Sequence, residues 1–410
     1  MLQKRSITII TGNYFPEDTA IGLYTTQFAK YLQKKGYNVT IITGFPYYPK
    51  WKIAENYINK NTYFTEIIDD ITIFRHKQFV PKKVTFLGRI KLMISFLFGA
   101  IKNYKKIANT DLVICIVPFT LSVIPSFFLA KKFKTKLWIH VQDFEFDLAF
   151  ESGIFKNKAV SNILKFFIFN FEKYLLKKAD VLSTISNNML SKAALKAPLT
   201  EKFFFPNWVS SENINPLNFK PHPYFSNEKF SLLYSGNIGN KQDWETLINL
   251  LPFINETTTE IVIVGQGAFE NELKEKCKLY SFVKFFDPVP YNELNDLLCS
   301  ADLHFLFQKT DVVDTVMPSK ILGMMASGKP SIITGNKNSE VKFIFNQAKC
   351  GYYFSDNNIK DINESINMLI EQIDLSKEFG KHGREYVISN FSEATILSNT
   401  TNKINQLLKN

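Results

Sequence analysis

Short apolar runs alternate with helical patterns along the whole chain, and this alternation restarts once. The first series contains runs rich in β-branched residues: Ile7–Ile10, Val39–Thr43, Ile71–Arg75, Leu112–Val117, Leu137–Val141 and Val181–Ser186. The second series contains Phe230–Ser235, Glu260–Val264, Val283–Phe286, Leu303–Phe307 and Ser331–Thr334. Such alternation predicts parallel sheets with helices on both faces. We therefore expect an α/β protein built from two doubly wound, Rossmann-like domains.

The length of 410 residues also favours two domains, because a single core rarely grows so large. A segment rich in Pro and Asn, residues 206–223, separates the two series. We predict an N-terminal domain over 1–205, a C-terminal domain over 206–385, and a last helix over 386–410 that packs back on the first domain. Ligands bind at the carboxyl ends of strands in such folds, so a cleft between the domains is the expected site.

The net charge of +11 is unevenly divided between the two halves. Residues 1–205 contain 30 Lys and Arg against 14 Asp and Glu, whereas the remainder contains 19 against 24. A basic half indicates an anionic partner such as a phospholipid, a lipid diphosphate or a nucleic acid, or lysines that solubilise an aromatic-rich surface. The lysines form no compact stripe or known motif, so we expect no nucleic-acid partner.

Two segments of the basic half have apolar centres and basic ends, Arg89–Lys106 and Lys156–Lys178. Segments of this kind lie on anionic membranes, or pack on a sheet as ordinary amphipathic helices. The run 113–130 is long enough to span a membrane, but Pro118 and Pro125 interrupt it. A buried strand followed by a turn and a helix explains it better. We expect a cytoplasmic protein, peripheral at the inner face of the membrane.

The cysteines give no sign of a metal or a disulfide framework. They are scattered along the chain: Cys115, Cys277, Cys299 and Cys350. No C-x-x-C pair and no His at metal spacing accompanies them, which fits a reducing compartment. We expect neither a metal nor a cofactor.

Polar residues follow two strands of the first series. Gly22 lies at a helix start, where it either exposes backbone N–H groups to an anion or allows tight packing. His140 ends a strand, and Asp143 and Glu145 come directly after it. An α/β domain exposes its reactive groups at such a position, so these three residues are the catalytic candidates. The loop after the first strand is not G-x-G-x-x-G, which argues against a nicotinamide dehydrogenase.

Two candidate anion sites follow strands of the second series. Gly236 and Asn237 begin a turn that contains Lys241 and precedes a helix. Ser319 and Lys320 lie at the start of another helix, whose free N–H groups favour an anion. Two lysines and two helix starts suit the diphosphate of a nucleotide, although a turn with a solvated lysine would look the same.

Segments along nearly the whole chain match a known family in order and spacing. They are 13–17, 21–25, 45–49, 140–145, 206–209, 235–242, 317–320 and 326–328, of which His140-Val141-Gln142-Asp143-Phe144-Glu145 is the most specific. In these segments the chain resembles the retaining GT-B glycosyltransferases of family 4. Within them, it is most similar to the WcaI-type group of colanic acid and other exopolysaccharides.

The resemblance implies a role for each candidate. Lys241, Ser319 and Lys320 match residues that contact the donor diphosphate. His140 matches a histidine near the donor sugar, and Gly22 matches a glycine that borders the diphosphate. Loops that border the nucleotide are matched by the segments containing Gly265, Gly267 and Pro288.

The resemblance also implies a reaction. A sugar would pass from a GDP- or UDP-sugar to a glycan acceptor linked to polyprenyl diphosphate, with retention and without a metal. The family's Glu-x7-Glu pair is replaced by Thr315 and Gly323, so the resemblance does not identify the ribose contact, for which Asp311 and Asp314 are candidates. Asn237 stands where the family often has Arg. A non-hydrolysing nucleotide-sugar 2-epimerase and a catalytically silent scaffold with the same fold remain as alternatives.

Overall fold

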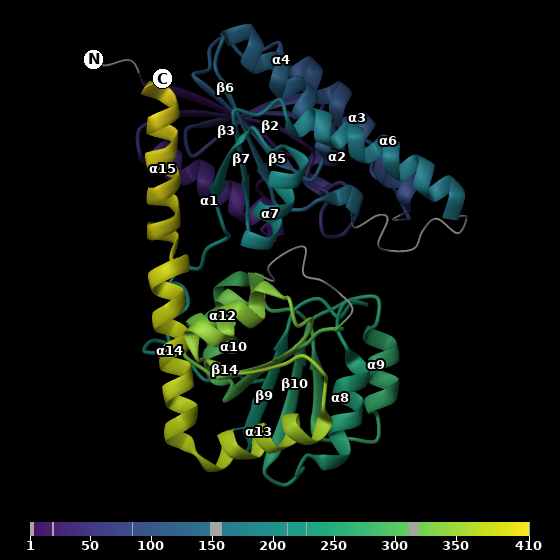
Figure 1. Cartoon of the computed structure of the whole chain (residues 1–410), viewed down its shortest axis with the longest axis vertical. Coiled ribbons are helices and arrows are strands. Elements are labelled where there is room, and N and C mark those ends of the chain that lie inside the picture. The colour runs from purple at the N-terminus through teal and green to yellow at the C-terminus, as the bar shows by residue number, and fades with distance from the viewer. Residues whose placement is uncertain are drawn as a thin grey trace. The chain divides into compact units, whose positions relative to one another are not determined.

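The computed structural model describes residues 4–18, 20–83, 85–147, 158–210, 212–226, 228–310 and 319–409. The chain forms two compact units (Figure 1). The first unit comprises Met1–Pro206 together with Leu397–Asn410, and the second comprises Asn207–Ile396. The chain therefore leaves the first unit next to the expected boundary. It returns only at Leu397, so residues 386–396 belong to the second unit and not to the first.

The first unit contains an eight-stranded sheet in the order β3-β4-β2-β1-β5-β6-β7-β8. Only β3 and β4 pair antiparallel within it. The strands are β1 (Ser6–Ile10), β2 (Asn38–Gly44), β3 (Tyr63–Ile68), β4 (Ile71–His76), β5 (Leu112–Val117), β6 (Lys136–Val141), β7 (Val181–Thr184) and β8 (Glu201–Phe204). The central strands β1 and β5 are buried along their whole length, as expected for a sheet covered on both faces.

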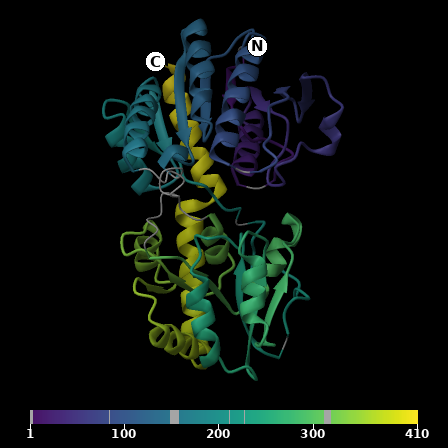
Figure 2. The same cartoon turned by 90° about the vertical axis from the view of Figure 1, so that its right-hand side faces the viewer.

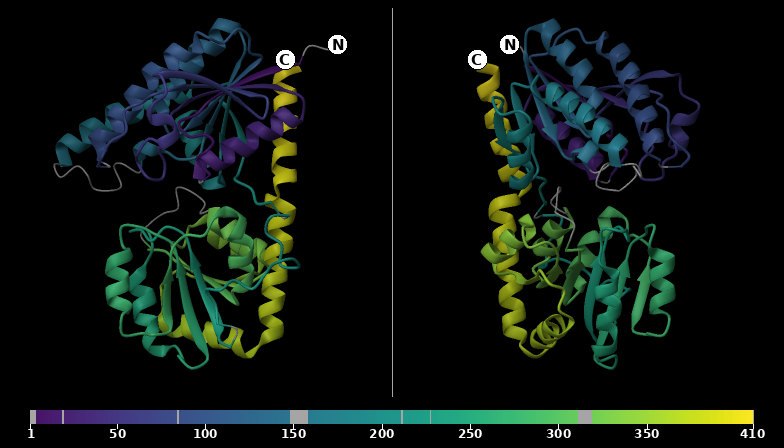
Figure 3. Two further views of the ribbon diagram at one scale, coloured as in Figure 1. Left: turned by 180° about the vertical axis from the view of Figure 1, so that it is seen from behind. Right: turned by 45° about the vertical axis from the view of Figure 1, so that its right-hand side comes forward.

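The helices of this unit connect successive strands. They are α1 (Ala20–Lys34), α2 (Glu55–Ile58), α3 (Phe86–Tyr104), η1 (Thr120–Ser122), α4 (Val123–Phe133), α6 (Lys158–Leu176) and α7 (Asn187–Lys196). Helix α4 packs against both α3 and α6, and the three lie side by side on one face of the sheet (Figures 1 and 3). The run 113–130 divides into β5, η1 and α4, as predicted. No helix in the described part of the chain is long and apolar enough to cross a membrane.

The second unit contains a six-stranded parallel sheet in the order β11-β10-β9-β12-β13-β14 (Figure 2). Its strands are β9 (Phe230–Ser235), β10 (Thr259–Val264), β11 (Val283–Phe286), β12 (Leu303–Phe307), β13 (Ser331–Thr334) and β14 (Gly351–Phe354). Helices α8 (Trp244–Leu250) and α9 (Glu270–Cys277) cover one face (Figure 1). The other face carries η3 (Tyr291–Glu293), α10 (Leu294–Ser300), α11 (Ser319–Ala326) and α12 (Glu340–Ala348). The predicted pair of doubly wound α/β domains is confirmed.

The last part of the chain is helical. It comprises α13 (Ile359–Glu371), α14 (Ile373–Phe391) and α15 (Glu393–Lys409), whereas the short η2 (Leu251–Phe253) follows α8 earlier in the chain. The expected last helix over 386–410 is divided, because α14 ends at Phe391 and α15 begins at Glu393. The later residues of α15 pack in the first unit, where Tyr37 donates a hydrogen bond to Asn405 at 2.5 Å and Leu397 and Ile404 are fully buried.

Candidate active site

In the second unit, the loops after β9 and β10 pack backbone against backbone. The N–H of Gly236 donates to the carbonyl of Val264 at 2.9 Å, and that of Ile238 to Gln266 at 3.0 Å. A Cβ on Gly265, whose φ is +158°, would lie 1.9 Å from the carbonyl oxygen of Gly236. These loops can therefore approach each other only if glycine occupies position 265.

The same contact explains Gly267, where a Cβ would lie 2.2 Å from the carbonyl oxygen of Ile238. Asn237 is exposed, and its carbonyl accepts a hydrogen bond from the hydroxyl of Tyr234 at 2.6 Å. The structure thus brings together Gly236, Asn237, Gly265 and Gly267 at the carboxyl edge of the second sheet, as the sequence predicted.

Lys320 of α11 places its ammonium group beside this loop. A Cβ on Gly236 would lie 2.8 Å from Nζ, which donates to the hydroxyl of Tyr234 at 3.0 Å and lies 4.6 Å from the centre of that ring. Burial lowers the pKa of Lys320 to about 8, and no carboxylate in the described part of the chain opposes this shift. A half-buried cation whose hydrogen-bond partner among the described residues is a neutral hydroxyl is poised to bind an anion.

The remaining candidates of the second unit are less closely tied to this cluster. Lys241 is exposed, and its carbonyl accepts a hydrogen bond from the backbone of Lys309. Pro288 is exposed just after β11. Ser319 begins α11, but its side chain lies outside the described residues, as do Asp311, Asp314 and Thr315.

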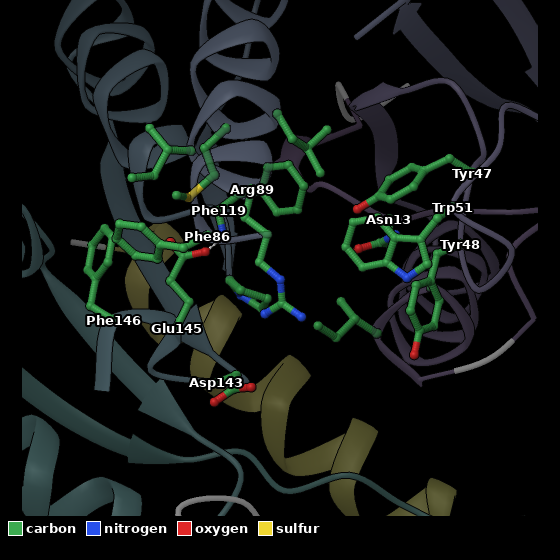
Figure 4. Close-up of a pocket in the computed structure, with 16 residues that line it drawn as sticks. Asn13, Tyr47, Tyr48, Trp51, Phe86, Arg89, Phe119, Asp143, Glu145 and Phe146 are labelled. Carbon is green, nitrogen blue, oxygen red and sulfur yellow. Dashed lines mark hydrogen bonds between the residues drawn. The ribbon is translucent and has the colours of Figure 1, made fainter. Parts of the chain in front are cut away.

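In the first unit, aromatic side chains surround a pocket of about 340 Å³ (Figure 4). The lining residues are Asn13, Ile21, Gly22, Tyr47, Tyr48, Trp51, Phe86, Arg89, Ile90, Leu92, Met93, Pro118, Phe119, Asp143, Glu145 and Phe146. The guanidinium group of Arg89 extends into the middle of the pocket, between Trp51 and Asp143 (Figure 4). It lies 5.7 Å from the ring of Trp51. The pocket therefore combines aromatic walls with a few polar groups, as ligand sites usually do.

Glu17 holds two walls of this pocket together. One carboxylate oxygen accepts hydrogen bonds from the backbone N–H groups of Tyr47 and Tyr48 at 2.8 and 2.7 Å. The other accepts from the Asn13 side chain at 3.0 Å and from the Tyr14 backbone at 3.2 Å. Burial raises the pKa of Glu17, whereas the four hydrogen-bond donors favour its carboxylate form and lower the pKa.

Gly22 lies against this residue. A Cβ at position 22 would lie 2.4 Å from the carbonyl oxygen of Glu17. Gly22 therefore allows close packing of α1 on the loop before it, while also lining the pocket. Of the two roles that the sequence left open for Gly22, the packing role has direct geometric support.

Glu145 caps the start of η1. Its carboxylate accepts hydrogen bonds from the backbone N–H groups of Phe119 at 3.0 Å and Thr120 at 2.5 Å. Burial raises the pKa of Glu145. Phe119 has a left-handed backbone with φ of 79°, which Glu145 helps to hold. Glu145 thus holds the start of η1 in place, and both Glu145 and Asp143 line the pocket (Figure 4).

His140 lies inside the first unit and does not line the pocket. Its side chain is 3% exposed, with Nδ1 2.9 Å from the hydroxyl of Ser183 and its ring centre 4.5 Å from that of Phe205. Burial lowers the pKa of His140 to about 3. Because His140 and Trp138 both contact Ser183, they occupy the same face of β6. His140 is therefore satisfied within the first unit, and its predicted contact with the donor sugar stays a prediction.

The sequence does not reveal the site role of several residues. Tyr234 precedes the glycine loop, and Glu17 and Trp51 lie in or next to segments that carry the resemblance, but no pattern singles out their side chains. In the sequence, Arg89 stands out only as a basic residue at the end of an apolar segment. The cluster of Tyr47, Tyr48 and Trp51 was a usable signal, because aromatic residues gathered on one loop often form a ligand wall.

Comparisons with known proteins match this architecture. The profile of the family described as glycosyl transferases group 1 matches residues 218–386, which contain the glycine loops and Lys320. The chain is 31% identical over 346 residues to the putative colanic acid biosynthesis glycosyl transferase WcaI of Escherichia coli K12. This alignment covers 80% of the chain and 83% of that relative. The chain belongs to the group 1 glycosyltransferases. It is therefore a glycosyltransferase enzyme.

Solved structures place this glycosyltransferase in the GT-B fold. Sucrose-phosphate synthase from Thermosynechococcus elongatus superposes with a TM-score of 0.73 at 15% identity, covering 99% of the chain and all of that structure. Anabaena Alr3699/HepE in complex with UDP and glucose superposes with a TM-score of 0.65 at 12% identity, covering 98% of the chain and all of that structure. At these identities the likeness concerns the fold alone.

Proposed function

We propose that this glycosyltransferase moves a sugar from a nucleoside-diphosphate sugar to a glycan acceptor in surface polysaccharide biosynthesis. The name of the Escherichia coli relative supports this biological setting. The observation that carries the donor class is the half-buried ammonium group of Lys320, which faces a glycine loop and has no ion-pair partner in the described part of the chain. A diphosphate would supply the negative charge that the described residues around Lys320 do not provide.

The donor would bind at the carboxyl edge of the second sheet. Gly236, Gly265 and Gly267 keep this edge free of side chains, so that a ligand can approach the backbone. Lys320 would neutralise the diphosphate from the side of the loop where α11 begins, and the exposed Lys241 would contact it from the solvent side. UDP in the complex of the structural relative favours a uridine nucleotide, and a GDP-sugar remains the second possibility.

The proposed reaction breaks the bond between the anomeric carbon and the diphosphate, and forms a bond from that carbon to an acceptor hydroxyl oxygen. The hydroxyl proton passes to the departing phosphate. Negative charge therefore grows on the diphosphate in the transition state, where Lys320 and Lys241 stabilise it. We propose retention of the anomeric configuration and no metal requirement, in line with the family resemblance.

The acceptor would bind in the aromatic pocket of the first unit. The rings of Tyr48 and Trp51 offer apolar surface to the face of a sugar. Asp143 and Arg89 supply an acceptor and a donor group for sugar hydroxyls, and Asp143 would orient the reacting hydroxyl. We further propose that the acceptor is linked to a polyprenyl diphosphate and that the enzyme works at the inner face of the membrane.

An acceptor-dependence assay tests this function. Purified enzyme is incubated with UDP- and GDP-sugars that raise its melting temperature, with and without a glycan acceptor, and nucleoside diphosphate release is measured. We expect release that depends on acceptor, with the product retaining the anomeric configuration by NMR. The variant Arg89→Gln should raise the KM for acceptor while donor binding stays unchanged. Epimerisation of the donor sugar at C2 in the absence of acceptor would show that the enzyme is a 2-epimerase. Absence of turnover with every donor would indicate a catalytically silent scaffold.

A further inference from the structure

Exposed apolar side chains gather on three neighbouring helices of the first unit, α3, α4 and α6. They include Leu87, Phe98, Phe128, Ile163, Phe166 and Phe167, whose exposed fractions range from 51% to 69%. Helix α4 packs between the other two, and all three lie on the same face of the sheet (Figures 1 and 3). Their outer sides therefore form one surface, which we call the α3–α4–α6 face.

The exposed residues of α3 follow the helical repeat. Leu87, Lys91, Phe98 and Lys105, the residue that caps the end of α3, lie on one stripe, because Lys91, Phe98 and Lys105 follow Leu87 by four, eleven and eighteen residues and so lie within about 40° of one another. The opposite side of the helix buries Phe96 against the sheet. Phe166 and Phe167 occupy the corresponding outer side of α6, whereas Glu172 points inward.

The charge on this face has one sign. In the described part of α3, α4 and α6 the only acidic side chain is Glu172, which is 1% exposed and paired with Lys196. Lys91, Lys105 and Lys131 are exposed on or beside the same face. The face thus interleaves aromatic rings with lysines and presents no carboxylate among its described residues.

We propose that the α3–α4–α6 face docks the enzyme on an anionic phospholipid surface. The aromatic rings would enter the boundary between headgroups and acyl chains, and the lysines would stay among the phosphates. A protein partner fits less well, because the cores of protein interfaces are depleted of lysine and these lysines would lose their water. At a membrane the long lysine side chains keep their ammonium groups hydrated.

Helix α3 also connects this face to the pocket. Phe86, Arg89 and Met93 line the pocket from a side of α3 that lies about 100° or more around the helix from the Leu87 stripe. Arg89 lies about 160° around α3 from Leu87, so the same helix carries the pocket on one side and the docked stripe on the other. The docking surface deepens the membrane association of the proposed function, and its failure would leave the proposed donor and transfer reaction intact.

Vesicle flotation with the full chain tests the docking. Vesicles of phosphatidylcholine alone and vesicles containing phosphatidylglycerol are compared, using the wild type, the double variant Phe166→Ser/Phe167→Ser and the charge variant Lys91→Glu/Lys105→Glu. The control Leu217→Ser/Leu279→Ser removes two side chains that are 94% and 84% exposed in the second unit. Thermal unfolding verifies that every variant folds.

We expect the wild type and the control to bind the anionic vesicles strongly and the neutral vesicles weakly. The Phe166/Phe167 variant should bind about tenfold more weakly, because two rings lose contact with lipid. The charge variant should lose the preference for anionic lipid. Transfer to a water-soluble acceptor should be unchanged in all variants. Transfer to a vesicle-bound acceptor should fall in the Phe166/Phe167 variant and in the Lys91/Lys105 variant. Absence of wild-type binding, or equal binding by the Phe166/Phe167 variant and the control, would overturn the proposal while leaving transfer to the soluble acceptor intact.

Discussion

Replacing Lys320 with methionine should stabilise the free enzyme and weaken its binding to nucleotide. Burial lowers the pKa of Lys320 from its ordinary value of 10.5 to about 8. A shift of this size corresponds to at most about 3 kcal/mol of unfavourable free energy for the charged form at pH 7. Methionine fills similar space without the charge. The hydroxyl of Tyr234 keeps its bond to the carbonyl of Asn237, so the substitution leaves no polar group without a partner.

Calorimetric unfolding and nucleotide titration measure the two effects. Without ligand, Lys320→Met should melt at the same temperature as the wild type at pH 7 or a few degrees higher. With UDP or GDP, the variant should bind about ten- to hundredfold more weakly, since a charge-assisted contact contributes about 1.5–3 kcal/mol.

The pH dependence provides a further check. Between pH 8 and 10.5 the unfolded chain holds more protons at Lys320 than the folded chain, so stability of the wild type should rise with pH relative to the variant. Nucleotide affinity should fall over the same range, because a bound diphosphate favours the protonated amine and the free site loses its proton first. A variant that binds nucleotide as tightly as the wild type would refute the assignment. Affinity independent of pH in the wild type would do the same.

Further predictions concern three other sites. Lys241→Ala should abolish transfer and leave the melting temperature unchanged, because the side chain is exposed and has no ion pair among the described residues; near-normal turnover would reject its role. Gly265→Ala should destabilise the second unit by more than about 2 kcal/mol in urea unfolding, since the new Cβ meets the neighbouring loop, whereas Gly323→Ala, whose nearest atom is 3.1 Å away, should be tolerated. Glu17→Gln should lower the free energy of unfolding by about 1–3 kcal/mol and raise the KM for acceptor, because the new amide NH₂ would face N–H donors in place of a carboxylate oxygen. An unchanged KM would show that Glu17 does not shape the acceptor pocket.

The strands that the sequence missed share one physical property. β3, β8 and β14 lie at the ends of the sheet orders, and β3 alternates between exposed and partly buried residues. Edge strands of this kind lack the continuous apolar runs by which the interior strands were recognised. The first β-branched run of the chain, by contrast, became β1, which is buried throughout.

The site was only partly predictable for a related reason. The glycine loops were placed correctly because a turn after a buried strand must lie at the carboxyl edge of the sheet. The burial of His140 was harder to predict, because a residue near the end of a strand can point into the core or toward the exposed edge of the sheet. Side chains alternate along a strand, so His140 shares the buried side of β6 with Trp138. Glu17 is held by Tyr47 and Tyr48, and Lys320 by Tyr234, all from distant parts of the sequence, and no local pattern specifies such contacts.

The path of the tail has a consequence for how the protein is made. Leu397 and Ile404 are fully buried, and Tyr37 is hydrogen-bonded to Asn405. The first unit is therefore incomplete until the segment from Leu397 onward has been synthesised, although its sheet is encoded before residue 206. A chain that stops before Leu397 would lack these buried side chains and would expose the apolar surface that they cover to chaperones and proteases.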